Sequence, residues 1–131
     1  MTSGLLDTSV VIDWDDPAVL EALPDEVAIS AVTLAELAAG PHLAGAPSEA
    51  ALRQARLQEV ESAFEPLPFD GTVARSYGQV VAAIVAAGRK HRRRVADLMI
   101  AATAHANGLD LYTRNVDDFS GLEGLITVVA V

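Results

Sequence analysis

The sequence predicts an α/β fold in which a central, mainly parallel sheet of about five short strands lies between two layers of helices. Three observations predict it. Short apolar runs alternate with helical patterns along the chain, as they do in strand–helix–strand units. Of the 131 residues, 51% are hydrophobic, which suits a buried core rather than a disordered chain. The length fits one compact domain, so we expect residues 1–131 to form a single domain.

The first half of the chain contains two strand patterns and three helical patterns. In order, these are a strand at 4–6, a short helix ending near Pro24, a strand at 27–30, and helices at 33–39 and 48–63. The first strand is a short apolar run that ends at Asp7. Gly40 and Pro41 are expected to stop the helix at 33–39. The segment 48–63 has apolar residues near helical spacing with charges between them.

The second half of the chain continues the alternation. In order, it is expected to contain a strand at 64–69, helices at 71–87 and 95–107, and strands at 109–113 and 126–131. Asp70 can cap the helix at 71–87, and Gly88 can close it. In a sheet of this kind, functional groups usually lie beyond the carboxyl ends of the strands.

The charge balance is strongly acidic, with 18 Asp and Glu against 9 Lys and Arg and a formal net charge of −9. Such a surface would repel phosphates over most of its area, which disfavours general nucleic-acid binding. The chain has no cysteine, so disulfides, thiol catalysis and thiolate metal sites are excluded. Neither a signal-peptide pattern nor a membrane-spanning apolar run is expected, and the cytoplasm is the expected location.

Four acidic residues differ from the rest in their positions. Asp7 ends the first strand, Glu36 lies in the helix after the second, Asp97 lies in an apolar helix, and Asp118 follows the strand at 109–113. A parallel sheet can bring these positions together. Two charges about 4 Å apart repel by roughly 4 kcal/mol at an effective dielectric of 20. A shared proton could offset this repulsion for one pair, and a divalent cation offsets it better for three or four carboxylates. Oxygen ligands without cysteine favour Mg²⁺ or Mn²⁺, which can activate water for attack on a phosphodiester.

Each of these acids also has a purely structural interpretation. Thr33 and Glu36 have the spacing of a capping box at a helix start. Asp97 could complement a helix dipole or pair with an arginine at 93–94. Asp7 could close a turn that leaves the first strand. Any one acid alone is better explained as structural, whereas the four together favour a catalytic site.

The segment 89–94 holds five of the chain's nine basic residues. A charge run of this kind is usually a solvated loop. This one leads directly into the helix that contains Asp97, so it should lie beside the acidic site. Arg92, Arg93 and Arg94 are therefore predicted to bind a phosphate backbone.

Four segments resemble, in sequence and in order, a PIN-domain ribonuclease of the VapC toxin branch of bacterial type II toxin–antitoxin systems. They are LLDTSV at 5–10, TLAEL at 33–37, ADLMIAA at 96–102 and TRNVDDF at 113–119. The resemblance spans nearly the whole chain. It implies a PIN-like three-layer fold and a Mg²⁺- or Mn²⁺-dependent endoribonuclease that cuts structured RNA.

The resemblance also implies that Asp7, Glu36, Asp97 and Asp118 form the acidic catalytic and metal site. Asp7 and Asp97 are expected to bind the metal directly. Glu36 and Asp118 would complete the site, partly through metal-bound water. In the family pattern the acid directly before Phe is the usual fourth member, which favours Asp118. The neighbouring Asp117 stays open as an alternative fourth acid.

Four further residues are expected to assist the site by resemblance. Thr8 or Ser9 resembles the hydroxyl that supports the first carboxylate. Asn115 occupies a position that carries an acid in some relatives, and here it is expected to support the site. Arg114 is expected to lie on the substrate side and to bind RNA.

The resemblance further implies partners. A cognate VapB-like antitoxin would wrap the toxin and block the site with a basic side chain. A homodimer is expected, with RNA in the groove between protomers, as is a toxin–antitoxin hetero-oligomer.

Two alternatives use the same sheet for another purpose. A receiver-like phosphoryl-transfer regulator would fit the length and the strand-terminal Asp7. Receivers, however, resemble one another in an early acidic pair and a late lysine after a strand, and the only lysine here is Lys90. A non-catalytic interaction module would keep the fold and lose the metal, which the four acids argue against.

Overall fold

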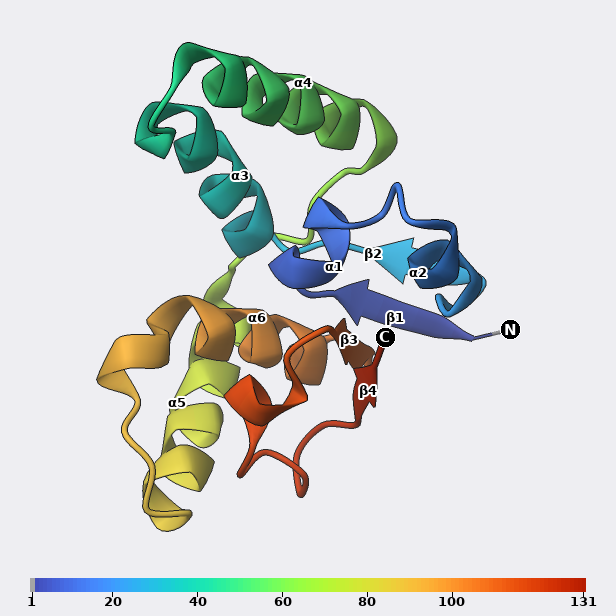
Figure 1. Cartoon of the computed structure of the whole chain (residues 1–131). Coiled ribbons are helices and arrows are strands. Elements are labelled where there is room, and N and C mark those ends of the chain that lie inside the picture. The colour runs from blue at the N-terminus through green and yellow to red at the C-terminus, as the bar shows by residue number, and fades with distance from the viewer. Residues whose placement is uncertain (1) are drawn as a thin grey trace.

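A sheet of four parallel strands, in the order β2-β1-β3-β4, forms the centre of the protein. The structure is a computed structural model that describes residues 2–131 (Figure 1). The strands are β1 (Ser3–Leu6), β2 (Glu26–Ala28), β3 (Asp110–Thr113) and β4 (Val128–Ala130). The α-helices are α1 (Thr8–Ile12), α2 (Pro17–Glu21), α3 (Ala31–Leu43), α4 (Pro47–Ala63), α5 (Gly71–Ala86) and α6 (Val95–Ala106). Two short 3₁₀ helices complete the set, η1 (Arg92–Arg94) and η2 (Val116–Phe119).

The register of β1 against β3 decides which residues meet at the carboxyl edge of the sheet. Leu6, the last residue of β1, lies opposite Tyr112 of β3. The backbone N–H of Asp7 donates to the Tyr112 carbonyl at 2.9 Å, so the pairing extends one residue beyond β1. Asp7 and Thr113 therefore leave the sheet side by side, although 106 positions separate them in sequence.

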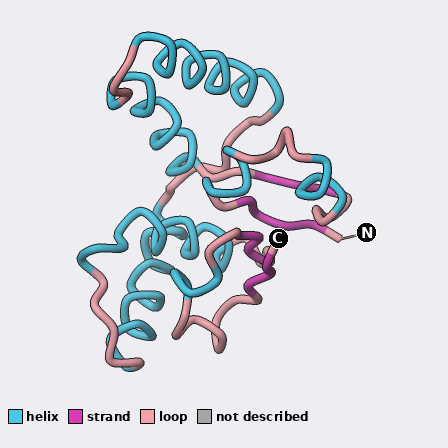
Figure 2. The backbone as a smooth tube through the Cα atoms, viewed as in Figure 1, coloured by secondary structure: helices cyan, strands magenta, loops and turns pink. Residues whose placement is uncertain are grey.

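Helices cover both faces of the sheet (Figure 2). Successive residues of a strand point to opposite faces, and β1 illustrates this alternation. Leu5 packs in a core with residues of α5 and α6, whereas Leu6 packs in a second core with residues of α1 to α4. Both leucines are fully buried. The predicted three-layer α/β/α fold is confirmed.

Helix α3 is longer at both ends than the predicted helix at 33–39. It begins after Ser30, whose side chain caps it, and it continues through Gly40 and Pro41 to Leu43. The expectation that Gly40 and Pro41 stop the helix is wrong. Pro41 lies in the last turn, and α4 packs against α3. The Arg53 guanidinium of α4 donates to the Gly40 carbonyl at 2.9 Å, which satisfies a backbone acceptor beside the proline.

The strand predicted at 64–69 is reduced to a single parallel bridge between Ser30 and Leu67. Leu67 receives its backbone bond from Ala31 at 2.8 Å and donates to Ile29 at 2.9 Å. The sheet thus has four strands rather than about five. The prolines that flank Leu67 lack the N–H groups a longer ladder needs, which explains why the pairing ends there.

The remaining differences from prediction are small. Asp7 is followed directly by the one-turn helix α1, which was not predicted. The last strand covers 128–130 rather than 126–131, and residues 92–94 of the basic segment form η1. Among residues 2–131, every helix is too short or too polar to cross a membrane.

Candidate active site

Asp7 stands at the carboxyl end of the central strand, where it is only 4% exposed. Its Oδ2 accepts hydrogen bonds from the Ser9 hydroxyl and from the Thr113 hydroxyl, each at 2.8 Å. Within residues 2–131, no hydrogen bond reaches Oδ1. Two donors thus fix the carboxylate by one oxygen and leave the other oxygen available to a ligand.

Thr113 is a supporting residue that sequence reasoning did not identify. It is fully buried, and its hydroxyl also accepts from the backbone N–H of Asn115 at 3.0 Å. The signal for it was the parallel pairing of β1 with β3, which places a β3-terminal hydroxyl beside Asp7. Asn115 itself is exposed, and in the described chain only its backbone joins this network.

Glu36 extends from α3 toward the same edge of the sheet. The Thr8 hydroxyl donates to its Oε1 at 2.7 Å and lies 3.0 Å from the Thr33 hydroxyl. The capping-box interpretation of Thr33 and Glu36 is wrong, because Ser30 caps the helix by accepting from the Thr33 N–H at 3.0 Å. Glu36 is therefore held by a hydroxyl from α1 rather than by its own helix.

Asp97 lies in the first turn of α6 and shows that the four acids share one electrostatic environment. The pKa of its carboxyl is raised from 3.8 to about 6, first of all by burial and then by the negative charges of Asp7, Asp118 and Glu36, in that order. The positive charge of Arg94 opposes these effects. Residues that are far apart in sequence therefore act on a single carboxyl group.

Asp118 is carried by η2, between β3 and the loop that leads to β4. Its Oδ1 lies 3.6 Å from Arg94 Nη1. Asp118 is among the charges that raise the Asp97 pKa, whereas the exposed neighbour Asp117 is not. The geometry thus brings Asp118, rather than Asp117, into the acidic group.

The donor set suits a hard divalent cation, since it consists of carboxylate oxygens supported by hydroxyl groups. Across residues 2–131, no three Asp, Glu or His side chains already stand close enough to hold a metal ion. The charges of Asp7, Asp118 and Glu36 nevertheless reach the Asp97 carboxyl and raise its pKa. Glu36 is exposed, and the Asp118 side chain is 43% exposed. Both side chains are therefore open to solvent at this edge of the sheet.

The sequence model of the PIN-domain family matches residues 4–125 of this chain. The chain belongs to the PIN-domain family. A relative in Mycobacterium tuberculosis named Ribonuclease VapC5 is 38% identical over 128 residues, which cover 96% of this chain and 92% of the relative.

Two solved structures resemble this chain over nearly its whole length. A crystal structure of VapBC-5 from Mycobacterium tuberculosis, described as a member of the VapBC family of toxin–antitoxin systems, matches with a TM-score of 0.85 and 37% identity over 100% of both chains. A crystal structure of FitAcB from Neisseria gonorrhoeae matches with a TM-score of 0.78 and 31% identity over 95% of each chain. The receiver-like alternative is not favoured.

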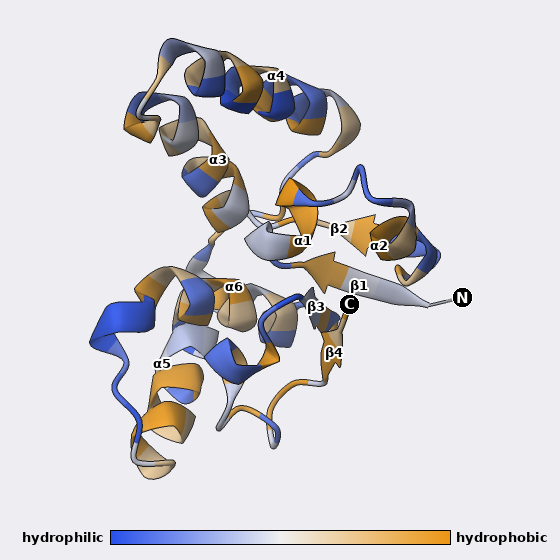
Figure 3. Ribbon diagram, viewed as in Figure 1, coloured by the Kyte–Doolittle hydropathy of each residue, from blue (hydrophilic) through white to orange (hydrophobic). Residues whose placement is uncertain are grey.

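In this PIN domain the predicted RNA-binding arginines have different surroundings. Arg92 and Arg93 are exposed in the hydrophilic segment between α5 and α6 (Figure 3). Arg94 is turned toward η2, and its Nη1 donates to the Asp118 carbonyl at 2.8 Å. Arg114 Nε lies 3.4 Å from Asp13 Oδ2 in an exposed ion pair.

A groove of about 540 Å³ runs from the acidic site between α1, α3 and α4. Thr8 and Glu36 form part of its lining, so the groove is continuous with the site. Its apolar lining includes Leu43 and Leu52, whose exposed fractions are 76% and 71%. The groove thus presents exposed apolar side chains beside the acidic site.

Proposed function

We propose that this chain is a toxin endoribonuclease of a VapBC-like type II toxin–antitoxin system, which hydrolyses RNA phosphodiester bonds in the cytoplasm with Mg²⁺ or Mn²⁺. The observation that supports it most strongly is the coupling of four carboxylates, from four separate segments, at the carboxyl edge of a PIN-domain sheet. The ribonuclease name of the VapC5 relative, which covers nearly the whole chain, supports the RNA substrate.

In this proposal Asp7 and Asp97 hold the cation, and Glu36 and Asp118 complete its surroundings. A bound Mg²⁺ would supply a polarised water and would offset negative charge at the scissile phosphate. The hydroxyl pair on Asp7 Oδ2 keeps Oδ1 directed to the site. Thr8 gives Glu36 a fixed orientation in the same way. These contacts orient the carboxylates before RNA binds. Polar groups that are already oriented need little reorganisation during the reaction, which favours catalysis.

RNA would approach from the side of the basic segment. Arg92 and Arg93 are exposed there and free to contact the phosphate backbone, with Arg114 as a further candidate. Much of the remaining surface is acidic, since the net charge is −9. The proposal therefore confines RNA to a path across the basic segment and the metal site.

The groove between α1, α3 and α4 is proposed to bind a segment of a cognate VapB-like antitoxin. Its exposed Leu43 and Leu52 offer apolar contact, and its Glu36 end opens on the acidic site, where a basic side chain from the antitoxin would be attracted. The matched structure of VapBC-5 belongs to a toxin–antitoxin family. A homodimer within a toxin–antitoxin hetero-oligomer is part of the proposal, with the 57%-exposed Val85 of α5 as an available apolar contact.

The test is cleavage of total cellular RNA by the purified, partner-free chain. Cleavage is expected with Mg²⁺ or Mn²⁺, to be lost with EDTA, and to fall steeply in Asp7→Asn. Asp15→Asn removes one exposed negative charge elsewhere and serves as the matched control, with wild-type activity. Equal cleavage by the wild type and Asp7→Asn, or cleavage that persists in EDTA, would contradict the proposal.

A further inference from the structure

The arginines at the two ends of the basic segment are directed at the backbone of η2. Arg89 Nη1 donates to the Asp117 carbonyl at 3.0 Å and to the Ser120 carbonyl at 2.9 Å. Arg94 Nη1 donates to the Asp118 carbonyl at 2.8 Å. Two guanidinium groups thus bind three backbone carbonyls in and directly after η2, even though these lie 23 to 31 positions away in sequence.

A turn as short as η2 needs such external donors. It has four residues, and the last carbonyls of any helix lack partners within the helix. Its own bonds are few, with the Asp118 N–H donating to Asn115 at 3.0 Å and the Ser120 N–H to Asp117 at 3.3 Å. Charged donors form stronger hydrogen bonds with carbonyls than neutral ones do. The two arginines therefore supply much of what holds this turn in place.

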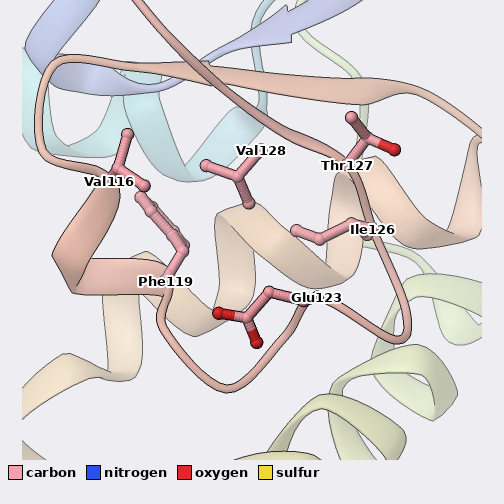
Figure 4. Close-up of a pocket in the computed structure, with 6 residues that line it drawn as sticks. All are labelled: Val116, Phe119, Glu123, Ile126, Thr127 and Val128. Atoms are coloured by element: carbon pink, nitrogen blue, oxygen red, sulfur yellow. The ribbon is translucent and has the colours of Figure 1, made fainter.

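The opposite side of η2 is fixed by packing. Phe119 is 1% exposed and belongs to the core shared with α5 and α6. Together with Val116 and Glu123 it also lines the pocket drawn in Figure 4. Glu123, in the loop that follows, accepts the Gly121 N–H through both carboxylate oxygens, at 2.9 and 3.2 Å. Gly121 has a φ of +101°, and a Cβ there would lie 3.1 Å from Ala87 Cβ, so glycine permits the end of α5 to approach this turn.

These contacts hold the backbone both before and after Asp118. Phe119, the next residue, is anchored in the core, and Arg89 binds the carbonyls on either side of the Asp118–Phe119 pair. Arg94 binds the carbonyl of Asp118 itself and lies 3.6 Å from its carboxylate. The segment that carries the fourth acid is thus attached to the segment that leads into α6, whose first turn contains Asp97.

We propose that Arg89 and Arg94 are positioning residues, which hold η2 so that Asp118 faces Asp7 and Asp97, and that RNA contact in the basic segment falls to Arg92 and Arg93. This inference rests on the proposed function for its kinetic consequences, but not for its structural ones. The arginines of the basic segment thus have two different roles, and the role of Arg94 changes from the predicted RNA binding to the positioning of Asp118.

The test compares charge-matched variants of the full chain by amide hydrogen exchange and by RNA cleavage with Mg²⁺. Arg89→Gln and Arg94→Gln remove the contacts to η2, whereas Arg92→Gln removes an exposed charge from the same segment. Arg75→Gln, on the exposed face of α5, is the control with unchanged activity. Arg94→Lys keeps the charge but replaces the planar donor group.

Arg89→Gln and Arg94→Gln are expected to speed amide exchange at Asp118 and Ser120, while Arg92→Gln leaves it unchanged. Arg89→Gln and Arg94→Gln are also expected to lower kcat by roughly 10- to 100-fold with KM nearly unchanged, because the two arginines act on the reaction through the position of the Asp118 carboxylate. Arg92→Gln is expected to raise KM and to weaken the salt dependence of RNA binding. Arg94→Lys should recover only part of the lost kcat. Thermal unfolding confirms that each variant is folded.

The inference is overturned if the Arg89 and Arg94 variants leave exchange in η2 unchanged, or if they raise KM with normal kcat as Arg92→Gln does. If Arg94→Gln is unfolded, Arg89→Gln decides the question, because in residues 2–131 the Arg89 side chain donates its hydrogen bonds to backbone carbonyls. Failure of the proposed function would appear separately, as absence of cleavage by the wild type. In that case the exchange measurements still decide whether the two arginines hold η2.

Discussion

Replacing Asp97 by asparagine is expected to stabilise the folded protein in metal-free buffer near neutral pH, although the same change should abolish activity. The reason is the raised pKa of the Asp97 carboxyl, which burial and three neighbouring acids move from 3.8 to about 6. About two pKa units correspond to about 3 kcal/mol at 1.36 kcal/mol per unit. Asp97 is only half-buried, so solvent screening reduces this penalty to about 1–2 kcal/mol.

The pH dependence has a definite sign. The folded-state pKa lies above the unfolded-state value, so between about pH 4 and about pH 6 the folded state binds more protons at Asp97 than the unfolded state does. Stability from this group is therefore fully present below about pH 4 and is lost as the pH rises through about 6. Asparagine does not titrate, so the advantage of Asp97→Asn should exist at about pH 8 and vanish at about pH 4.

Urea unfolding of the wild type, Asp97→Asn and the exposed control Asp15→Asn, all with EDTA, measures the free energy of unfolding at both pH values. The expected result is a gain of about 1–2 kcal/mol for Asp97→Asn at about pH 8 only. Added Mg²⁺ should narrow or reverse the difference, because a ligand that binds the folded state stabilises it. A less stable Asp97→Asn at about pH 8, or an equal gain at both pH values, would refute the reasoning.

Three other expectations follow from particular contacts. Thr113→Val removes one of the two hydroxyl donors to Asp7 and should lower the RNA cleavage rate by roughly 10- to 100-fold, measured at saturating Mg²⁺. Gly4→Ala places a methyl group against the Tyr112 ring on the neighbouring strand and should cost about 1–3 kcal/mol in urea unfolding. The apparent affinity for Mg²⁺, obtained from the metal dependence of cleavage, should increase as the pH rises through about 6, because the Asp97 proton must leave before the carboxylate can ligate.

Each of these expectations has its own contradicting outcome. Full activity in Thr113→Val would show that the Ser9 hydroxyl alone orients Asp7. A Gly4→Ala variant as stable as the wild type would show that Tyr112 can move without loss, and Gly45→Ala, where a Cβ meets no atom within 4 Å, is the control. An affinity for Mg²⁺ that does not change with pH would exclude Asp97 as a direct ligand.

The candidate acidic site could be proposed from the sequence because its members occupy positions that a parallel sheet brings together. Asp7 follows an apolar strand, and Asp118 lies a few residues after another, so the direction of the strands alone places both at one edge. The pairing register makes the prediction specific, since it sets Asp7 beside Thr113. The choice of Asp118 over Asp117 depended on family resemblance, because both residues follow the same strand.

The residues that hold the acids were less predictable, because their roles depend on contacts between distant segments. Thr33 and Glu36 match a local capping pattern, but Ser30 is the cap and Glu36 accepts from Thr8, 28 positions away. Arg94 was assigned to RNA from its charge and from its place just before the helix that contains Asp97. Its bonds to η2 depend on how the segment after α5 folds back, which spacing in the sequence does not reveal.

Local backbone rules also failed where packing was decisive. Gly40 and Pro41 are ordinary helix terminators, yet α3 continues through them with α4 packed alongside. Around Leu67 the regular structure is shorter than expected instead of longer, because the apolar segment predicted to form a strand makes a single bridge. In both places the tertiary partner, rather than the intrinsic preference of the segment, determined the outcome.

The measurement that tests the central claim most directly is Mn²⁺ binding, by calorimetry, to the wild type and to variants in which each acid is replaced by its amide. If Asp7, Glu36, Asp97 and Asp118 form one metal site, the affinity for Mn²⁺ and the RNA cleavage rate should fall together in every variant, most strongly for Asp7→Asn and Asp97→Asn. The exposed control Asp15→Asn should match the wild type in both. Unchanged Mn²⁺ affinity in Asp7→Asn and Asp97→Asn would contradict the account.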